Sequence, residues 1–148
     1  MKNGRPEQIL QRCVFDHLRL RGQPGAFFFH VPNGGYRTPI EAKIMKGLGV
    51  RAGVPDLLVI YQGQVYGLEL KAPNGRTTPQ QNCALADMEA AGAHTAVAIG
   101  IDQALATLEG WGLLRGKAFL AGQPMERPAK SPGCPADELK PQSPTLPA

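Results

Sequence analysis

Hydrophobic residues recur at two different spacings along this chain, and each spacing predicts a different kind of element. Near the start, the apolar residues between Leu10 and Leu18 recur at steps of three and four, which places them on one face of a helix. Proline suits a first helical turn, so Pro6 indicates a helix over residues 6–21. Glu7 shares the face of Leu10, and we therefore expect its carboxylate to point toward the core rather than toward water.

Short apolar runs bounded by glycine, proline or polar residues predict strands. The first run, AFFFHV at 26–31, is aromatic and short, and we expect it to form a buried strand. Three further runs predict strands at 56–61, 65–71 and 95–99. The first two of these are separated by only a short polar turn, which indicates a hairpin.

Two Thr-Pro pairs mark the starts of helices. Thr38 and Thr78 each supply a capping hydroxyl and are followed by proline and then by glutamate or glutamine at the third helical position. We therefore expect helices over 39–46 and 79–91, and a last helix over 102–111. The order α, β, α, β, β, α, β, α predicts an α/β domain with a mixed central sheet flanked by helices, in which the crossover after Thr78 leads to a parallel strand.

Length and composition limit the organisation of the chain. Its 148 residues suit one domain, and the proline-rich composition near the end predicts a folded domain over 1–122 followed by a disordered tail over 123–148. No apolar run approaches the about 20 residues needed to cross a bilayer, and no secretion signal opens the chain, so we expect a cytoplasmic protein. The cysteines form no CxxC pair and are expected to be reduced thiols, two of them in the core.

Charge is distributed unevenly between the two halves. Residues 1–76 hold eleven Lys or Arg against five Asp or Glu, whereas residues 77–148 hold five against seven. The first half is therefore where we expect an anion to bind.

Three charged residues lie inside two strongly apolar strands, where burial of a charge is costly. They are Asp56 in the first strand of the hairpin and Glu69 and Lys71 in the second. Glu69 and Lys71 are two residues apart and share one face of their strand, with Leu68 and Leu70 on the other face. This arrangement predicts a site on the face of Glu69 if Asp56 lies there too.

The length of the turn at 62–64 decides whether Asp56 lies on that face. A loop of two residues, either 62–63 or 63–64, places it there, whereas a loop of all three turns it away. We expect the shorter loop, because Gly63 suits the first central position of a type II′ turn. The two carboxylates would then stand about 5 Å apart at Cβ, which suits a hard divalent cation, and the ammonium of Lys71 beside them can stabilise charge on an attacked phosphate.

Four motif blocks resemble a known nuclease family in their sequence and order. They are HVPNGG at 30–35, GVPDL at 53–57, ELKAPNGR at 69–76 and TPQQ at 78–81. The acid-acid-lysine spacing resembles the PD-(D/E)xK nucleases. All four blocks together resemble the VRR-NUC (virus-type replication-repair nuclease) domain, over about residues 7–99.

The resemblance implies a restriction-endonuclease-like fold with a metal site. Mg²⁺ or Mn²⁺ would be held by Asp56, Glu69 and the backbone carbonyl of Leu70, with Glu7 matching the acid of the family's first helix. Lys71 matches the catalytic lysine of the family.

The resemblance also implies an activity. It points to a metal-dependent endonuclease that hydrolyses phosphodiester bonds of branched, flapped or Holliday-junction DNA, in phage replication or DNA repair in a bacterial or phage-infected cell. It favours a homodimer, because two cuts in a symmetric junction suit two sites. Gln81 matches the glutamine that opens the family's next helix.

Other residues near the predicted site are candidates for contacts with nucleic acid: His30, Asn33, Gly34, Gly35, Arg37, Lys43, Lys46, Arg51 and Arg76. Each candidate also has a structural interpretation, as a turn or as a solvated charge, while Gln81 can be only a helix cap and Glu7 can favour the helix dipole. For the whole chain, a catalytically silent DNA-binding module and an RNA-processing nuclease are the alternatives.

Overall fold

A computed structural model describes residues 5–32 and 37–116, so the predicted tail at 123–148 and the boundary at 122 lie outside the described residues. Within the described ranges the elements follow the predicted order. They are α1 (Pro6–Arg21), β1 (Phe27–His30), α2 (Pro39–Gly47), β2 (Leu57–Tyr61), β3 (Gln64–Lys71), α3 (Pro79–Ala90), β4 (His94–Ile99) and α4 (Gly100–Gly110).

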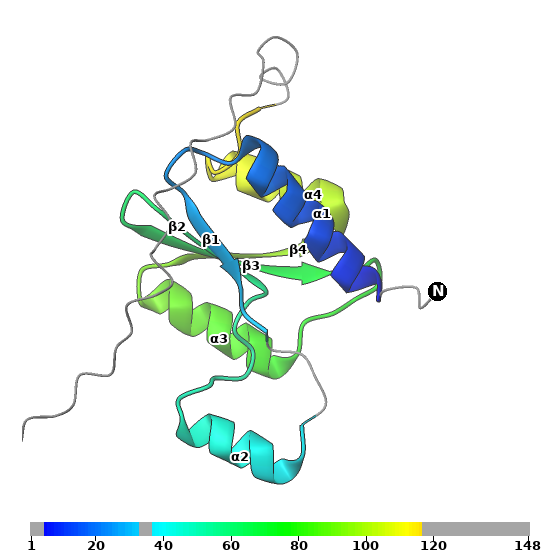
Figure 1. Ribbon diagram of the computed structural model, residues 1–148, viewed down its shortest axis with the longest axis vertical. Helices are drawn as coiled ribbons and strands as arrows, with labels where there is room; N and C mark the ends of the chain where they lie inside the picture. Colours follow the sequence, from blue (N-terminus) through cyan, green and yellow to red (C-terminus); the bar gives the residue numbers. More distant parts are fainter. Residues whose placement is uncertain (1–4, 33–36, 117–148) are drawn as a thin grey trace, which may run out of the picture.

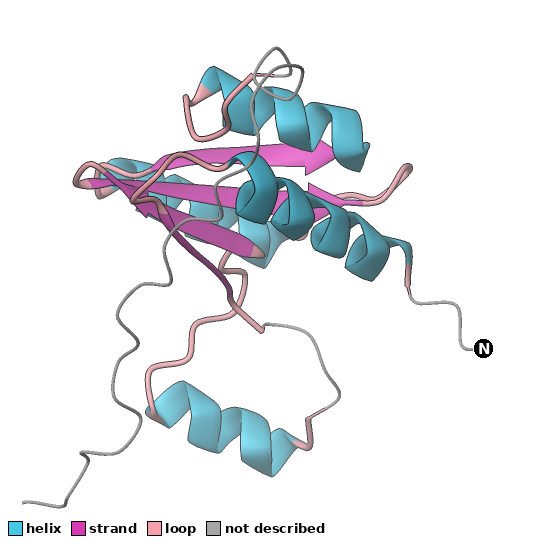
Figure 2. Ribbon diagram, turned by 45° about the horizontal axis from the view of Figure 1, so that its top comes forward, coloured by secondary structure: helices cyan, strands magenta, loops and turns pink. Residues whose placement is uncertain are grey.

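The described strands form one mixed sheet in the order β1-β2-β3-β4 (Figure 1). β1, β2 and β3 are antiparallel neighbours, and β4 pairs parallel to β3 after the crossover through α3, as predicted. Helices α1 and α4 cover one face of the sheet and α3 covers the other, while α2 stands apart from these layers (Figures 1 and 2). Within the described ranges, none of the helices combines the length and apolar character that a membrane span requires.

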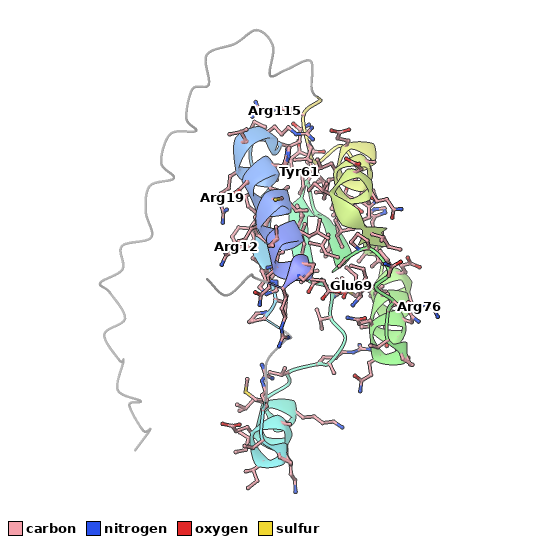
Figure 3. The ribbon with its side chains drawn as sticks, turned by 90° about the vertical axis from the view of Figure 1, so that its right-hand side faces the viewer. Arg12, Arg19, Tyr61, Glu69, Arg76 and Arg115 are labelled. Atoms are coloured by element: carbon pink, nitrogen blue, oxygen red, sulfur yellow. The ribbon has the colours of Figure 1, made fainter. Side chains whose placement is uncertain are left out.

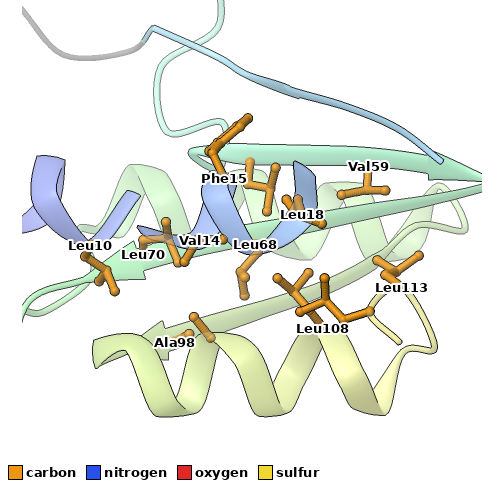
Figure 4. Packing of buried hydrophobic residues seen from close by; sticks show 13 residues of the cluster. Leu10, Val14, Phe15, Leu18, Val59, Leu68, Leu70, Ala98, Leu108 and Leu113 are labelled. Carbon is orange, nitrogen blue, oxygen red and sulfur yellow. The ribbon is translucent and has the colours of Figure 1, made fainter. Parts of the chain in front are cut away.

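The hydrophobic core lies between the sheet and the pair α1 and α4 (Figure 4). The apolar stripe of α1 enters it through Val14 and Leu18, and Leu108 of α4 lies opposite. Leu68 and Leu70 of β3 are fully buried in the same layer. The apolar faces that the helical and strand periodicities predict therefore pack together in one layer.

Three expectations about burial are wrong, each for a geometric reason. β1 is the edge strand and no helix covers one of its faces, so Phe27 is 63% exposed rather than buried. Glu7 is exposed, because the first turn of α1 precedes the core and burial begins only at Leu10. Cys13 and Cys83 are also exposed, since each lies off the buried stripe of its helix.

One buried charge at the end of α1 was not predicted from the sequence. Arg21 is 1% exposed, and its Nη1 donates to Glu109 Oε1 at 2.6 Å and to the backbone carbonyl of Arg115 at 2.7 Å. Its Nε lies 3.2 Å from His17 Nδ1. The guanidinium therefore ties the end of α1 to α4 and to the segment that follows it.

We expect Arg21→Ala to lower the free energy of unfolding by about 2–3 kcal/mol, because it removes the buried partner of an ion pair and leaves a partly buried carbonyl without its donor. The matched control is Arg19→Ala on the same helix. Arg19 pairs with Asp16 at 3.2 Å, but both side chains are more than half exposed, so its loss should cost at most about 0.5 kcal/mol. Urea denaturation measures both values, and equal losses would contradict the role of Arg21.

Candidate functional site

The hairpin between β2 and β3 brings the predicted acidic residues to one face of the sheet. Its turn consists of Gln62 and Gly63, both with positive φ (49° and 74°), which is the geometry of a type I′ turn. The expected loop of two residues is confirmed, but the type II′ turn with Gly63 in first place is wrong, because Gln62 also adopts the left-handed conformation. In this register Asp56, directly before β2, stands opposite Glu69.

Glu69 is the most deeply buried acid of this face, with 2% of its surface exposed. Its Oε1 accepts a hydrogen bond from Gln81 Nε2 at 2.6 Å and lies 3.2 Å from Lys71 Nζ. Lys71 is itself only 8% exposed. The other carboxylate oxygen, Oε2, is buried and has no hydrogen-bond partner within the described part of the chain.

The first turn of α3 places Gln81 beside Glu69. Thr78 Oγ1 accepts from the Gln81 backbone N–H at 3.2 Å, and Gln81 Oε1 accepts from the Thr78 backbone N–H at 2.9 Å, which completes a capping box. The amide oxygen of Gln81 therefore caps the helix while its amide nitrogen binds Glu69. The two interpretations of Gln81 from the sequence, helix cap and site residue, are both compatible with this geometry.

The segment before Asp56 is fixed by a close backbone approach. Gly53 has φ +83°, and a Cβ there would overlap the carbonyl oxygen of Gln80 and lie 2.8 Å from Gln81 N. Only glycine avoids both the strain and the overlap. The GVPDL and TPQQ blocks, far apart in sequence, are thus in contact at Gly53.

The side chain of Asp56 is hydrogen-bonded to β3 on one side and borders a solvent-accessible hollow on the other. Its Oδ2 accepts from the Leu70 backbone N–H at 3.0 Å, and its backbone carbonyl oxygen lies 2.7 Å from His30 Nδ1. The side chain also borders a hollow of about 430 Å³, lined by Arg5, Glu7, Gln8, Gln11, His30, Pro32 and Asp56. Glu7 therefore faces Asp56 across this hollow rather than from the core.

The sequence analysis missed Arg5, Gln8 and Gln11 as residues of this hollow. Helical spacing would have identified Gln11, because it lies four positions after Glu7 on the same side of α1.

The basic candidates are not gathered around the two carboxylates. Lys43 and Lys46 lie on α2, which stands away from the sheet (Figure 1). Arg51 forms an ion pair with Asp87 of α3, and Arg76 is exposed beside that helix (Figure 3). Arg37 is half-buried ahead of α2. The candidates Asn33, Gly34 and Gly35 lie outside the described residues.

Burial disfavours the charged forms of both acids. Burial raises the pKa of Glu69 to about 7, and the charge of Asp56 adds to this shift while Lys71 opposes it. Burial likewise raises the pKa of Asp56, against the effect of the Leu70 N–H. Two neighbouring acids that resist ionisation are a feature of cation sites and of catalytic sites.

The donor set fits a cation that takes few protein ligands. Within residues 5–32 and 37–116 no three His, Cys, Asp or Glu side chains converge, so a cation at this face would take its acidic ligands mainly from Asp56 and Glu69. The Oε2 of Glu69 is buried and has no hydrogen-bond partner among the described residues, and a cation would satisfy its lone pairs. Mg²⁺ suits such a site, because it keeps several waters and needs only one or two carboxylates.

Comparisons with known proteins give the fold. No protein-family model matches the sequence, and no curated protein matches it. A solved structure described as "VRR_NUC domain protein" is similar with a TM-score of 0.60 and 25% identity, over 74% of this chain and 89% of that chain. A second, described as "VRR_NUC domain", has a TM-score of 0.51 and 21% identity, over 72% and 97%. The predicted α/β fold class is confirmed.

The raised pKa of Glu69 predicts how stability depends on pH. A carboxyl that titrates near 4.5 when unfolded and near 7 when folded holds its proton longer in the folded state, so stability falls as pH rises between those values. In EDTA we expect a loss of about 3 kcal/mol in the free energy of unfolding from pH 4.5 to 7.5. Glu69→Gln should remove most of this loss. Identical pH profiles for the two proteins, measured by urea denaturation, would contradict the shift.

Proposed function

We propose, from the premise that this chain carries a VRR-NUC domain, that it is a metal-dependent endonuclease that hydrolyses DNA phosphodiester bonds. The observation that carries the proposal is the convergence of Asp56, Glu69 and Lys71 on one face of the hairpin. Burial of Glu69 and Lys71 beside the half-buried Asp56 costs free energy that a structural role does not repay. A site for a cation and a phosphate gives these charges a function.

Asp56 and Glu69 would hold Mg²⁺ or Mn²⁺ together with the backbone carbonyl of Leu70, and Glu7 would add an acid from across the hollow. Held by these residues, such an ion would supply Lewis-acid chemistry, polarising the scissile phosphate and lowering the pKa of a bound water. The unpartnered Oε2 of Glu69 supports this assignment, because it is the buried acceptor that remains without a donor in the described part of the chain.

The chain's own residues would orient the reacting groups. Lys71 Nζ, held 3.2 Å from Glu69 Oε1 and largely shielded from water, would position the attacking water and stabilise charge on the phosphate. Gln81 is a positioning residue, since its 2.6 Å hydrogen bond fixes the carboxylate of Glu69. The capping box at the start of α3 holds Gln81 in place, and strand β3 holds Lys71.

We propose that the substrate is branched, flapped or Holliday-junction DNA, and that the enzyme acts in phage replication or DNA repair in the cytoplasm of a bacterial or phage-infected cell. The rival functions, a silent DNA-binding module and an RNA-processing nuclease, share the basic half of the chain. Burial of Glu69 and Lys71 next to Asp56 favours catalysis over binding alone. Matched DNA and RNA substrates distinguish the two nucleases.

We also propose a homodimer, supported by apolar surface that the described chain leaves uncovered. α2 has no buried residue, and Ile40, Ile44 and Leu48, four positions apart, are 73%, 56% and 76% exposed. Phe27 and Phe29 are exposed on the uncovered face of β1, with ring centroids 5.7 Å apart. A second copy of the chain would supply an apolar partner for both surfaces.

The catalytic proposal predicts different losses for acid and lysine variants. Asp56→Ala and Glu69→Ala should abolish cleavage of labelled linear, flapped and four-way DNA in Mg²⁺ or Mn²⁺, and should lose metal binding while DNA binding persists. Lys71→Ala should keep the metal and lose roughly 10²–10⁴-fold in turnover. Calorimetry with Mn²⁺ and gel assays measure these effects.

Asp102→Ala is the matched control for that experiment, because Asp102 is an exposed acid in the first turn of α4. It should cleave as the wild type does. Undiminished cleavage by both acid variants, or cleavage of RNA in preference to every DNA form, would refute the proposal as stated.

The homodimer predicts that a charge on the α2 stripe shifts the assembly. Ile44→Asp should raise the dimer dissociation constant at least tenfold in analytical ultracentrifugation, and its melting temperature as a monomer should not fall, since the helix buries nothing within the chain. Sedimentation of the wild type as a monomer at all concentrations would rule the dimer out.

A further inference from the structure

A second hollow adjoins the one at Asp56 and extends it along α1. It has a volume of about 200 Å³ and is lined by Gln11, Arg12, Phe15, Arg19 and His30. Gln11 and His30 also line the hollow of about 430 Å³ that borders Asp56. The two hollows therefore adjoin at Gln11 and His30, and we call the pair, which extends from Arg19 to Asp56, the α1 groove.

The walls of the α1 groove carry positive charge. Arg12 and Arg19 are seven positions apart on α1, so both project from the same side of the helix (Figure 3). The floor between them is Phe15, which is 9% exposed, and the guanidinium of Arg19 lies 5.7 Å from its ring centroid. This arrangement presents two exposed arginines above a rigid apolar floor.

The acidic groups near the groove do not cancel these charges. Asp16 pairs with Arg19 at 3.2 Å, but both side chains are well exposed, and such surface pairs are weak enough for another anion to displace. Glu7 and Asp56 lie together at the far end, where the proposed cation would bind. Arg12 and Arg19 thus lie at one end of the groove without an acid among the described residues of its wall, whereas at the other end Glu7 and Asp56, the proposed metal ligands, stand beside Arg5.

The dimensions of the groove suit one strand of nucleic acid. From Glu7 to Arg19, α1 rises about 18 Å at 1.5 Å per residue. That length spans about five nucleotides of one strand at the 3.4 Å spacing of B-DNA, and fewer nucleotides of a more extended single strand. Hollows of a few hundred Å³ are of small-ligand size, which fits a single sugar-phosphate backbone and not a duplex.

His30 lies where the two hollows meet. Its Nδ1 is 2.7 Å from the backbone carbonyl oxygen of Asp56, so the imidazole is anchored to the residue that ends the groove. A strand lying along the groove would pass His30 immediately before it reaches Asp56.

We propose that the α1 groove binds one strand of the DNA substrate, with Arg12 and Arg19 contacting its phosphates, and leads that strand to Asp56. This inference rests on the proposed nuclease function and deepens it by naming the path of the strand. It assigns binding to two arginines that composition alone would leave as solvated surface.

The test compares binding of single-stranded and flapped DNA in EDTA, which prevents cleavage, over a series of salt concentrations. Arg12→Gln with Arg19→Gln should weaken binding at least tenfold and flatten the log-log salt slope by about 1.4, at 0.7 per phosphate contact on single strands. Arg12→Lys with Arg19→Lys should restore most of the affinity. Both arginines are exposed, so thermal melts should show intact folding.

The matched control, Lys130→Gln with Lys140→Gln, removes the same two charges from the segment after the described domain. It should bind within twofold of the wild type. An equal loss of DNA affinity in this control would show that net charge alone explains the effect of the arginine variants, and it would overturn the inference.

Neutral methylphosphonates, placed one at a time along the strand, connect the arginines to particular phosphates. Wild-type binding should weaken at a few consecutive positions on one side of the cleavage point, and the double Gln variant should be insensitive at those positions. Equal sensitivity of the wild type and the double Gln variant would overturn the proposed path of the strand along the α1 groove, but it would leave the nuclease proposal standing. Failure of the wild type to bind any DNA would instead refute the proposed function.

Discussion

Burial of a carboxylate in the sheet is the constraint on which the rest of this site depends. Glu69 is almost fully enclosed, so its charge must be met by partners that other elements hold in place. Lys71 arrives from the same strand and Gln81 from the first turn of α3, and both reach the same carboxylate oxygen. The second oxygen has no hydrogen-bond donor among the described residues, and the proposed cation would bind it. The proposed binding of a cation follows from the fact that the charge of Glu69 is only partly compensated by Lys71 and Gln81.

Two local devices fix the geometry on either side of that carboxylate. The tight turn at Gln62 and Gly63 sets the register that brings Asp56 opposite Glu69, and a shift of one residue would send Asp56 to the other face. Gly53 allows the preceding segment to pack against the backbone at the start of α3. From the sequence, Gly53 and Gly63 look like ordinary turn residues. In the structure they are what aligns Asp56 with Glu69 on the neighbouring strand.

Much of the fold could be predicted from local chemistry. The capping boxes at Thr38 and Thr78 and the parity of the hairpin are determined by neighbouring residues, and these predictions are confirmed. Burial was harder to predict, because it depends on which strand lies at the edge and on where a helix meets the sheet. The exposure of Phe27 and the burial of Arg21 arise from such long-range placement, which periodicity does not encode.

The excursion of the chain through α2 has a consequence for how this fold can diversify. The polypeptide leaves the sheet after His30 and rejoins the site at Gly53, and no residue of α2 is buried on the way. Insertions, deletions or exchanges of this arm would leave the hairpin register and the capping box of α3 intact. Relatives could therefore acquire new selectivity by replacing one appendage while inheriting an unaltered pair of acids at the proposed site.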